Sequence, residues 1–197
     1  MGRWEPNARE RLGRSALELF LERGYESTTA AEIAERAGLA KSTFFRHFAD
    51  KREVLFGGQD RLNRLFIDAV TGVPDSATPL DAVAAALDAV AAAFGPEQRA
   101  FVRQRHAVIS GNSDLREREL LKLAALTAVM ADTLRERGVP DPAASLAAEL
   151  GSLAFRNAHA RWIDPANQQD FPDLARQELN ELKAATATLD QAPGTAR

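Results

Sequence analysis

Apolar residues recur at intervals of three and four along most of this chain, a spacing typical of amphipathic α-helices. No stretch alternates apolar and polar residues in the way that predicts a β-strand. Glycine and proline interrupt the helical pattern repeatedly, which divides the chain into about nine helical segments. We therefore predict an all-α protein, with a small N-terminal helical domain followed by a larger one.

The segment from residue 28 to residue 52 has the strongest local signals. Thr29 and Glu32 stand three apart before an apolar run, which is the capping-box pattern of a helix start. Gly38 lies where that helix is expected to end. A second short helix follows, with Phe44 and Phe48 four apart on its inward face. Two short helices joined by a glycine turn predict a helix-turn-helix, whose second helix is shaped to enter a DNA major groove.

Charge is distributed unevenly around this segment. Residues 36–52 carry five basic residues and one acidic residue, whereas the whole chain has a formal net charge of −3. A largely acidic protein with one basic helix is suited to docking a single face on a nucleic acid.

The composition bounds the class of protein. The chain has 197 residues, of which 45% are hydrophobic, and it has no cysteine, so disulfides and thiolate–zinc sites are excluded. No run of about 18 uncharged apolar residues is present, and the N-terminus lacks an apolar signal core. We expect a soluble, cytoplasmic protein without a membrane partner.

The sequence offers little support for an enzyme. It has no phosphate-binding glycine loop, no H-E-x-x-H pair and no nucleophile elbow. Its three histidines are far apart and lack metal-ligand spacing. We therefore predict no catalytic residue, no metal site and no cofactor.

The block from Leu12 to Leu55 resembles the DNA-binding domain of the TetR family of bacterial transcriptional regulators. The resemblance is carried by Ala16-Leu17-Glu18-Leu19-Phe20, Arg23-Gly24-Tyr25, Thr28-Thr29, Ile33-Ala34, Ala37-Gly38 and Thr43-Phe44-Phe45-Arg46-His47-Phe48 followed by Lys51. The family often has a phosphate-binding tyrosine where this chain has Phe45, so here we expect the ring to touch a thymine methyl or a sugar.

DNA contacts are expected from nine residues. Lys41 and Arg46 are assigned to base edges or flanking phosphates, and Ser42 and Thr43 to phosphates or bases. The other polar side chains, Thr28, Thr29, His47 and Lys51, are assigned to the DNA backbone. The full set is Thr28, Thr29, Lys41, Ser42, Thr43, Phe45, Arg46, His47 and Lys51.

We expect a helix-turn-helix domain over residues 1–52, a linking helix over 51–72, a ligand-binding and dimerisation domain over 73–190, and a disordered tail over 191–197. Arg3 and Trp4 form either a DNA-reaching arm or a disordered terminus. Gly57 and Gly58 interrupt the linking helix, either as a hinge or because helices pack closely there; the sequence does not decide between them.

Aromatic and polar residues of the second domain are candidates for an effector pocket, although an ordinary core is the plainer interpretation. They are Phe66, Phe94, Phe101, Arg105, His106, Ile109, Leu126, Met130, Phe155 and His159. The C-terminal half contains Leu115-Arg116-Glu117-Arg118-Glu119-Leu120, Leu134-Arg135-Glu136-Arg137-Gly138, and Phe155 with Trp162. Through these residues it resembles TetR-family regulators of the mycofactocin type, and the resemblance implies an apolar or acyl-CoA-like small-molecule effector.

The last two helices carry apolar stripes that fit either a homodimer interface or the chain's own core. The residues expected at the interface are Leu146, Leu150, Leu153, Trp162, Leu179 and Leu182. A two-fold dimer presents two recognition helices to a palindromic operator. The resulting prediction is a ligand-released, homodimeric repressor bound to double-stranded DNA. The alternative is a helical small-molecule-binding or structural dimer without specific DNA binding.

Overall fold

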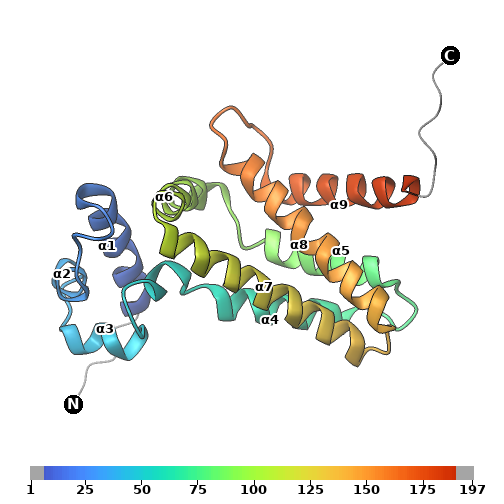
Figure 1. Cartoon of the computed structure of the whole chain (residues 1–197), viewed down its shortest axis with the longest axis horizontal. Helices are drawn as coiled ribbons and strands as arrows, with labels where there is room; N and C mark the ends of the chain where they lie inside the picture. The colour runs from blue at the N-terminus through green and yellow to red at the C-terminus, as the bar shows by residue number, and fades with distance from the viewer. Residues whose placement is uncertain (1–6, 190–197) are drawn as a thin grey trace. The chain divides into compact units, whose positions relative to one another are not determined.

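The computed structural model describes residues 7–189, in which every regular element is a helix (Figure 1). The predictions for Arg3, Trp4 and residues 191–197 concern residues outside this range. The described helices are α1 (Ala8–Arg23), α2 (Ala30–Arg36), α3 (Lys41–His47), the 3-10 helix η1 (Glu53–Phe56), α4 (Gln59–Gly72), α5 (Pro79–Ala91), the 3-10 helix η2 (Pro96–Gln98), α6 (Arg99–Ser110), α7 (Ser113–Glu136), α8 (Asp141–Ile163) and α9 (Phe171–Thr188). The prediction of an all-α fold is confirmed.

The chain forms two compact units. The first contains the described residues up to Asp60 together with Ala100–Lys122, and the second contains Arg61–Arg99 with the described residues from Leu123 onward. This division differs from the boundary expected near residue 73, because α6 and the start of α7 pack with the N-terminal helices. Ile109 and Leu115, both fully buried, belong to the same apolar cluster as Leu12.

The helix-turn-helix is built from the signals that its sequence carries. The Thr29 hydroxyl accepts a hydrogen bond from the Glu32 backbone N–H at 3.3 Å, and the Glu32 carboxylate accepts one from the Thr29 backbone N–H at 2.8 Å. Gly38 has φ 66°, the left-handed conformation that glycine adopts at little cost. Phe44 and Phe48 are buried beneath α3. The expected capping box, glycine turn and inward phenylalanine pair are therefore present.

The expected linking helix over 51–72 is not continuous. A short 3-10 helix, Glu53–Phe56, is followed by a turn at Gly57-Gly58, and α4 begins only at Gln59. Asp50 stabilises the start of this segment by accepting hydrogen bonds from the backbone N–H groups of Arg52 and Glu53 at 2.8 and 3.1 Å. The helix breaks where two successive glycines remove helix propensity.

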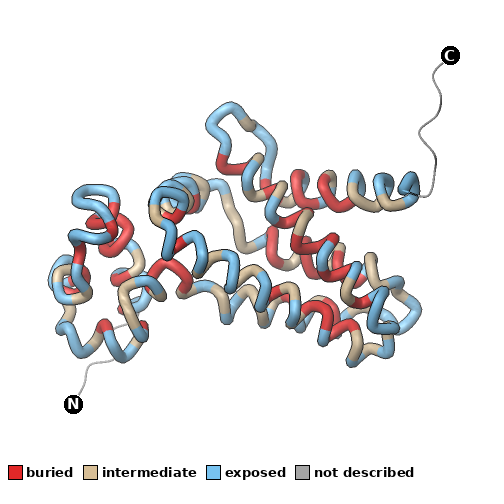
Figure 2. The backbone as a smooth tube through the Cα atoms, viewed as in Figure 1, coloured by how far each residue is buried: buried red, intermediate tan, exposed pale blue. Residues whose placement is uncertain are grey.

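In the second unit α5, α8 and α9 pack against one another. Figure 2 shows buried stretches alternating with exposed ones along α8, as expected of a helix with one buried face. A Cβ at Gly151 would lie 2.6 Å from Val83 Cγ1, so the glycine permits the close approach of α5 and α8. The rings of Phe94 and Phe171 lie 4.8 Å apart between centroids, within a cluster completed by Phe155 and Trp162.

No single helix within residues 7–189 is long and apolar enough to cross a membrane; Pro79–Ala91 and Pro96–Ser110 meet that test only when taken together as a bent pair. Over the same residues no three His, Asp or Glu side chains are grouped so as to hold a metal ion.

Candidate nucleic-acid interface

Helix α3 buries one face and exposes the other. Phe44 is fully buried in the first unit, while Lys41, Ser42 and Arg46 are exposed. Thr43 and His47 are half-buried at the sides of the same helix. The outward face of α3 therefore presents polar and cationic groups, supported from below by an apolar anchor.

Phe45 stands out on this face because a large aromatic ring is 49% exposed. The Lys41 ammonium lies 5.9 Å from the centroid of the Phe45 ring, four residues along the helix. Phe45 also meets Phe44 edge to face at 5.4 Å. An exposed ring beside a cation can contact a thymine methyl or a sugar while the ammonium reaches a base edge or a phosphate.

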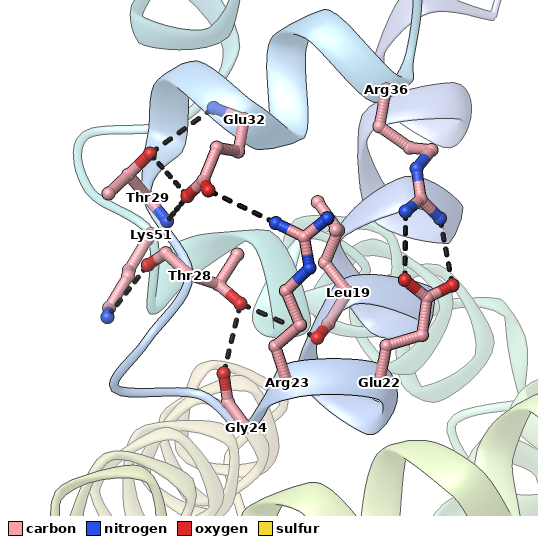
Figure 3. Close-up of polar contacts among 9 residues, drawn as sticks. All are labelled: Leu19, Glu22, Arg23, Gly24, Thr28, Thr29, Glu32, Arg36 and Lys51. Atoms are coloured by element: carbon pink, nitrogen blue, oxygen red, sulfur yellow. Dashed lines mark hydrogen bonds and ion pairs between the residues drawn. The ribbon is translucent and has the colours of Figure 1, made fainter.

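The positive charge counted in the sequence is only partly available for binding. Arg36 donates to Glu22 at 2.8 and 3.0 Å, and Arg52 forms an ion pair with Asp50 at 2.8 Å (Figure 3 shows the Arg36 pair). Across residues 7–189, Lys41 and Arg46 have no carboxylate partner. Of the five basic residues counted over 36–52, the two without a carboxylate partner that remain exposed, Lys41 and Arg46, both lie on α3.

Thr28 was expected to contact the DNA backbone, but its side chain faces the interior of the first unit. Its side chain is buried, with 1% of its surface exposed, and its hydroxyl donates to the Gly24 carbonyl at 2.9 Å (Figure 3). The hydroxyl therefore holds the loop between α1 and α2. Thr29 is exposed, although its hydroxyl is engaged in the capping box.

Lys51 also differs from the phosphate ligand that was expected. Its ammonium donates to the backbone carbonyls of Tyr25, Glu26 and Thr28 at 2.8, 3.3 and 3.0 Å. It also lies 4.2 Å from the centroid of the Tyr25 ring. Since an ammonium has three hydrogens, these contacts use its full capacity as a donor. Lys51 thus stabilises the loop between α1 and α2 through these contacts.

His47 lies at the end of α3 in a cationic setting. Burial, followed by the charges of Arg46 and Arg9, holds the pKa of its imidazole below the ordinary value of 6.5. The ring is consequently neutral at pH 7 unless an anion approaches it.

The residues expected to line an effector pocket are divided between the two units. Phe101, Arg105, His106 and Ile109 belong to the first, and Phe66, Phe94, Leu126, Met130, Phe155 and His159 to the second. The list therefore does not describe a single cavity within either unit.

Arg105 and Ile109 are structural residues of the first unit. Ile109 is fully buried in its apolar cluster. Arg105 donates to the Leu55 carbonyl at 2.6 Å and to Glu119 at 3.2 Å, with its guanidinium 5.1 Å from the Phe56 ring centroid. Burial lowers the pKa of Arg105, and Glu119 opposes that shift. The arginine thus ties α6 and α7 to η1.

A cavity of about 390 Å³ lies between the end of α1 and α6 in the first unit. Leu21, Tyr25, Val108 and Asn112 are among its lining residues, and the Asn112 side chain donates to Glu26 at 2.8 Å. No local pattern in the sequence predicts this cavity, because its two sides are at least 80 residues apart in the chain.

Half of the residues expected at a dimer interface lie inside the second unit. Trp162, Leu179 and Leu150 are buried within the chain, so they cannot meet a second copy in this conformation. Leu153 and Leu182 are partly exposed, and Leu146 is 56% exposed. The helical stripes thus serve mainly the chain's own core.

Glu178 on α9 was not singled out by the sequence. Its carboxylate is buried and accepts hydrogen bonds from Asn157 at 3.0 Å and Arg161 at 2.7 Å, both on α8. A buried acid with both oxygens paired fixes the two helices relative to each other.

Sequence profiles of known families match both parts of the chain. Residues 14–56 match the profile of bacterial regulatory proteins of the tetR family, and residues 77–187 match that of the MftR C-terminal domain. The HTH-type transcriptional regulator TcmR of Streptomyces glaucescens is 44% identical over 75 residues, a match that covers 38% of this chain and 33% of that protein. The matched segment thus spans about a third of the length of that relative.

Solved structures share the fold over nearly the whole chain. FadR of Thermus thermophilus, a transcriptional repressor in complex with lauroyl-CoA, has a TM-score of 0.57 at 23% identity, covering 96% of this chain and 98% of that one. FadR of Bacillus subtilis, in complex with stearoyl-CoA, has a TM-score of 0.59 at 16% identity, covering 88% of this chain and 96% of that one.

Proposed function

Because the chain belongs to the tetR family of bacterial regulatory proteins, we propose that this DNA-binding transcriptional regulator acts as a homodimeric, ligand-released repressor. It acts on double-stranded DNA in the bacterial cytoplasm and catalyses no reaction. The observation that carries this proposal is the outward face of α3, where Lys41 and Arg46 have no acidic partner across residues 7–189 and Phe45 is exposed between them.

DNA docking assigns distinct tasks to these side chains. Arg46 and Lys41 have the reach and charge to bind guanine edges or flanking phosphates, and Ser42 and Thr43 supply hydroxyls for phosphates or bases. His47 takes up a proton on meeting a phosphate. Replacing Arg46 by alanine should weaken operator binding by about 1–3 kcal/mol if it reads a base.

The test is fluorescence anisotropy with a duplex that the full-length chain selects from random DNA. Arg14→Ala is the matched control, because Arg14 is an exposed arginine paired with Glu10 on α1. Arg46→Ala should bind more weakly than wild type, and Arg14→Ala should not. Failure of the wild-type chain to select any sequence would favour the alternative of a helical dimer without specific DNA binding.

Dimerisation follows from the geometry of operator reading. One α3 spans only a few base pairs, whereas two related by a two-fold axis reach successive major grooves roughly 34–36 Å apart. Of the residues expected at the interface, Leu146 and Leu153 on α8 and Leu182 on α9 remain accessible for such a contact. Sedimentation equilibrium should give a dimer mass, and Leu146→Glu should shift the equilibrium toward monomer. A monomeric wild-type chain would contradict the dimer.

The effector that we propose carries a long apolar chain, as an acyl-CoA does. The match of residues 77–187 to the MftR C-terminal profile and the acyl-CoA complexes of the two FadR structures support this choice, together with the apolar interior around Phe94, Met130 and Phe155. Because these side chains are packed together, binding requires the helices of the second unit to rearrange. The effector releases DNA only by its differential affinity for the two states.

Titration of lauroyl-CoA into the preformed complex tests the effector, with free coenzyme A as the control for the head group. Release by lauroyl-CoA and not by coenzyme A is the expected result. Equal release by both, or by neither, would overturn the assignment of an acyl chain.

A further inference from the structure

We propose that Arg9, on the first turn of α1, is an additional ligand for the DNA backbone, and that Gly57 is required to hold it in place. This inference rests on the proposed DNA docking of α3 and extends the contact surface to a residue far from α3 in sequence. The sequence did not decide whether Gly57 and Gly58 form a hinge or allow close packing. Under this proposal Gly57 allows close packing.

The position of Arg9 is fixed by an aromatic ring. Its guanidinium carbon lies 5.1 Å from the centroid of the Phe48 ring, and Phe48 is the buried residue that ends α3. Arg9 itself is exposed. A cation held over a ring keeps its planar face on the aromatic group and its N–H edge free to donate. The ring therefore orients the guanidinium beside the end of the recognition helix.

Gly57 makes room for this arrangement. A Cβ at position 57 would lie 3.1 Å from Phe48 Cε1 and 3.2 Å from Arg9 Nε, closer than nearly all real Cβ contacts. By contrast, a Cβ at Gly58 would have nothing within 4 Å. Both glycines can therefore be replaced by alanine in a matched pair, in which only the first substitution crowds Arg9 and Phe48.

The charges around Arg9 lack an internal counter-ion. The charge of Arg9 helps to lower the pKa of His47. Arg46 is a second cation at the same end of α3 and lowers the same pKa. Over the described part of the chain Arg9 has no carboxylate partner. The other arginines of this helix differ, since Arg11 donates to the Ala37 carbonyl, Arg14 pairs with Glu10 and Arg23 pairs with Glu32.

The two guanidinium charges of Arg9 and Arg46, beside the neutral imidazole of His47, are suited to an external anion. A guanidinium binds a phosphate with two parallel N–H donors, which fixes direction as well as charge. The anion that α3 brings to this position on docking is a backbone phosphate of the same duplex. We therefore assign Arg9 to the phosphate that flanks the base pairs read by α3.

A structural explanation also exists and makes a different prediction. A cation near the C-terminal end of a helix is favoured by the helix dipole, which would affect stability alone. A phosphate ligand releases condensed counter-ions from DNA, so its removal reduces the salt dependence of binding. The slope of binding against salt separates the two roles.

The experiment measures anisotropy of a duplex selected by the full-length wild-type chain, at a series of KCl concentrations. For Arg9→Ala the slope of log affinity against log salt should fall in magnitude by about 0.9 for each protomer bound. Arg9→Lys should keep the wild-type slope because it keeps the charge. Arg14→Ala is the control for loss of an arginine on α1 and should also keep it.

Gly57→Ala should reduce the slope in the same direction as Arg9→Ala, and Gly58→Ala should not. Thermal unfolding of each variant identifies any loss of fold. If Arg9→Ala has the slope of Arg14→Ala while the wild type binds its duplex, Arg9 is structural and this inference fails alone. If the wild type selects no duplex, the proposed DNA-binding function fails first.

Discussion

The ammonium of Lys51 lies 2.8 Å from the backbone carbonyl oxygen of Tyr25, across a gap of 26 residues in sequence. Two further carbonyls, those of Glu26 and Thr28, accept from the same group. The lysine that ends the recognisable motif therefore closes the loop between α1 and α2. Its positive charge is used to position the helix-turn-helix rather than to contact an external anion.

Replacing Lys51 by alanine should destabilise the protein by about 2 kcal/mol, because hydrogen bonds to charged groups are worth roughly 1.5–3 kcal/mol. Urea denaturation measures this loss. Lys41→Ala is the matched control, since Lys41 is exposed and surface changes usually stay within about 0.5 kcal/mol. A stable Lys51→Ala variant with a reduced salt slope would instead restore Lys51 as a phosphate ligand.

Arg105, like Lys51, should contribute to the stability of the fold. Its removal leaves the Leu55 carbonyl and the Glu119 carboxylate without their partner, and losing hydrogen bonds to a charged group costs about 1.5–3 kcal/mol at a partly buried site. Arg105→Ala should therefore unfold at a lower urea concentration than wild type, whereas Arg103→Ala, on the exposed side of α6, should not. Equal stability of the two variants would show that Arg105 is dispensable for the first unit.

Phe45 provides a test of how α3 meets DNA. Phe45→Tyr adds a hydroxyl where the family often has one, and we expect operator affinity to rise about five-fold, which corresponds to one hydrogen bond of about 1 kcal/mol. Phe45→Ala should weaken binding because the exposed ring is lost. Anisotropy measures both, and an unchanged affinity for Phe45→Ala would remove Phe45 from the interface.

The imidazole of His47 reports on Arg9 without any DNA. Burial, Arg46 and Arg9 together hold the pKa of His47 below 6.5, so in Arg9→Ala it should move up toward that value. NMR titration of the imidazole protons measures the shift. Between its lowered folded pKa and 6.5 the unfolded chain binds more protons, so the stability contributed by neutral His47 is lost as pH falls through this window. That loss should be smaller in Arg9→Ala, and an unmoved pKa would place Arg9 too far from His47 to act on it.

Local signals allowed the helix-turn-helix to be predicted from the sequence. The Thr29–Glu32 capping box, Gly38 and the Phe44–Phe48 pair each act over a few residues, and all three have the predicted structure. Helix α3 also presents Lys41 and Arg46 outward as expected.

Pairings over long sequence distances were not predictable in this way. Arg36 forms an ion pair with Glu22, fourteen residues away in sequence. The charge count over residues 36–52 therefore includes one cation that is already paired within the protein. Ile109 and Leu115 join the apolar cluster of the first unit although they follow residues of the second. Periodicity shows that such a side chain is buried, but it does not show against which element.

The central claim is that two copies of α3 dock through Lys41 and Arg46 in successive major grooves. Hydroxyl-radical footprinting of the selected duplex tests it most directly. The wild-type chain should protect two stretches about 10 base pairs apart from centre to centre, and the Lys41→Ala, Arg46→Ala double variant should protect neither. Protection by the double variant equal to that of wild type would contradict the claim.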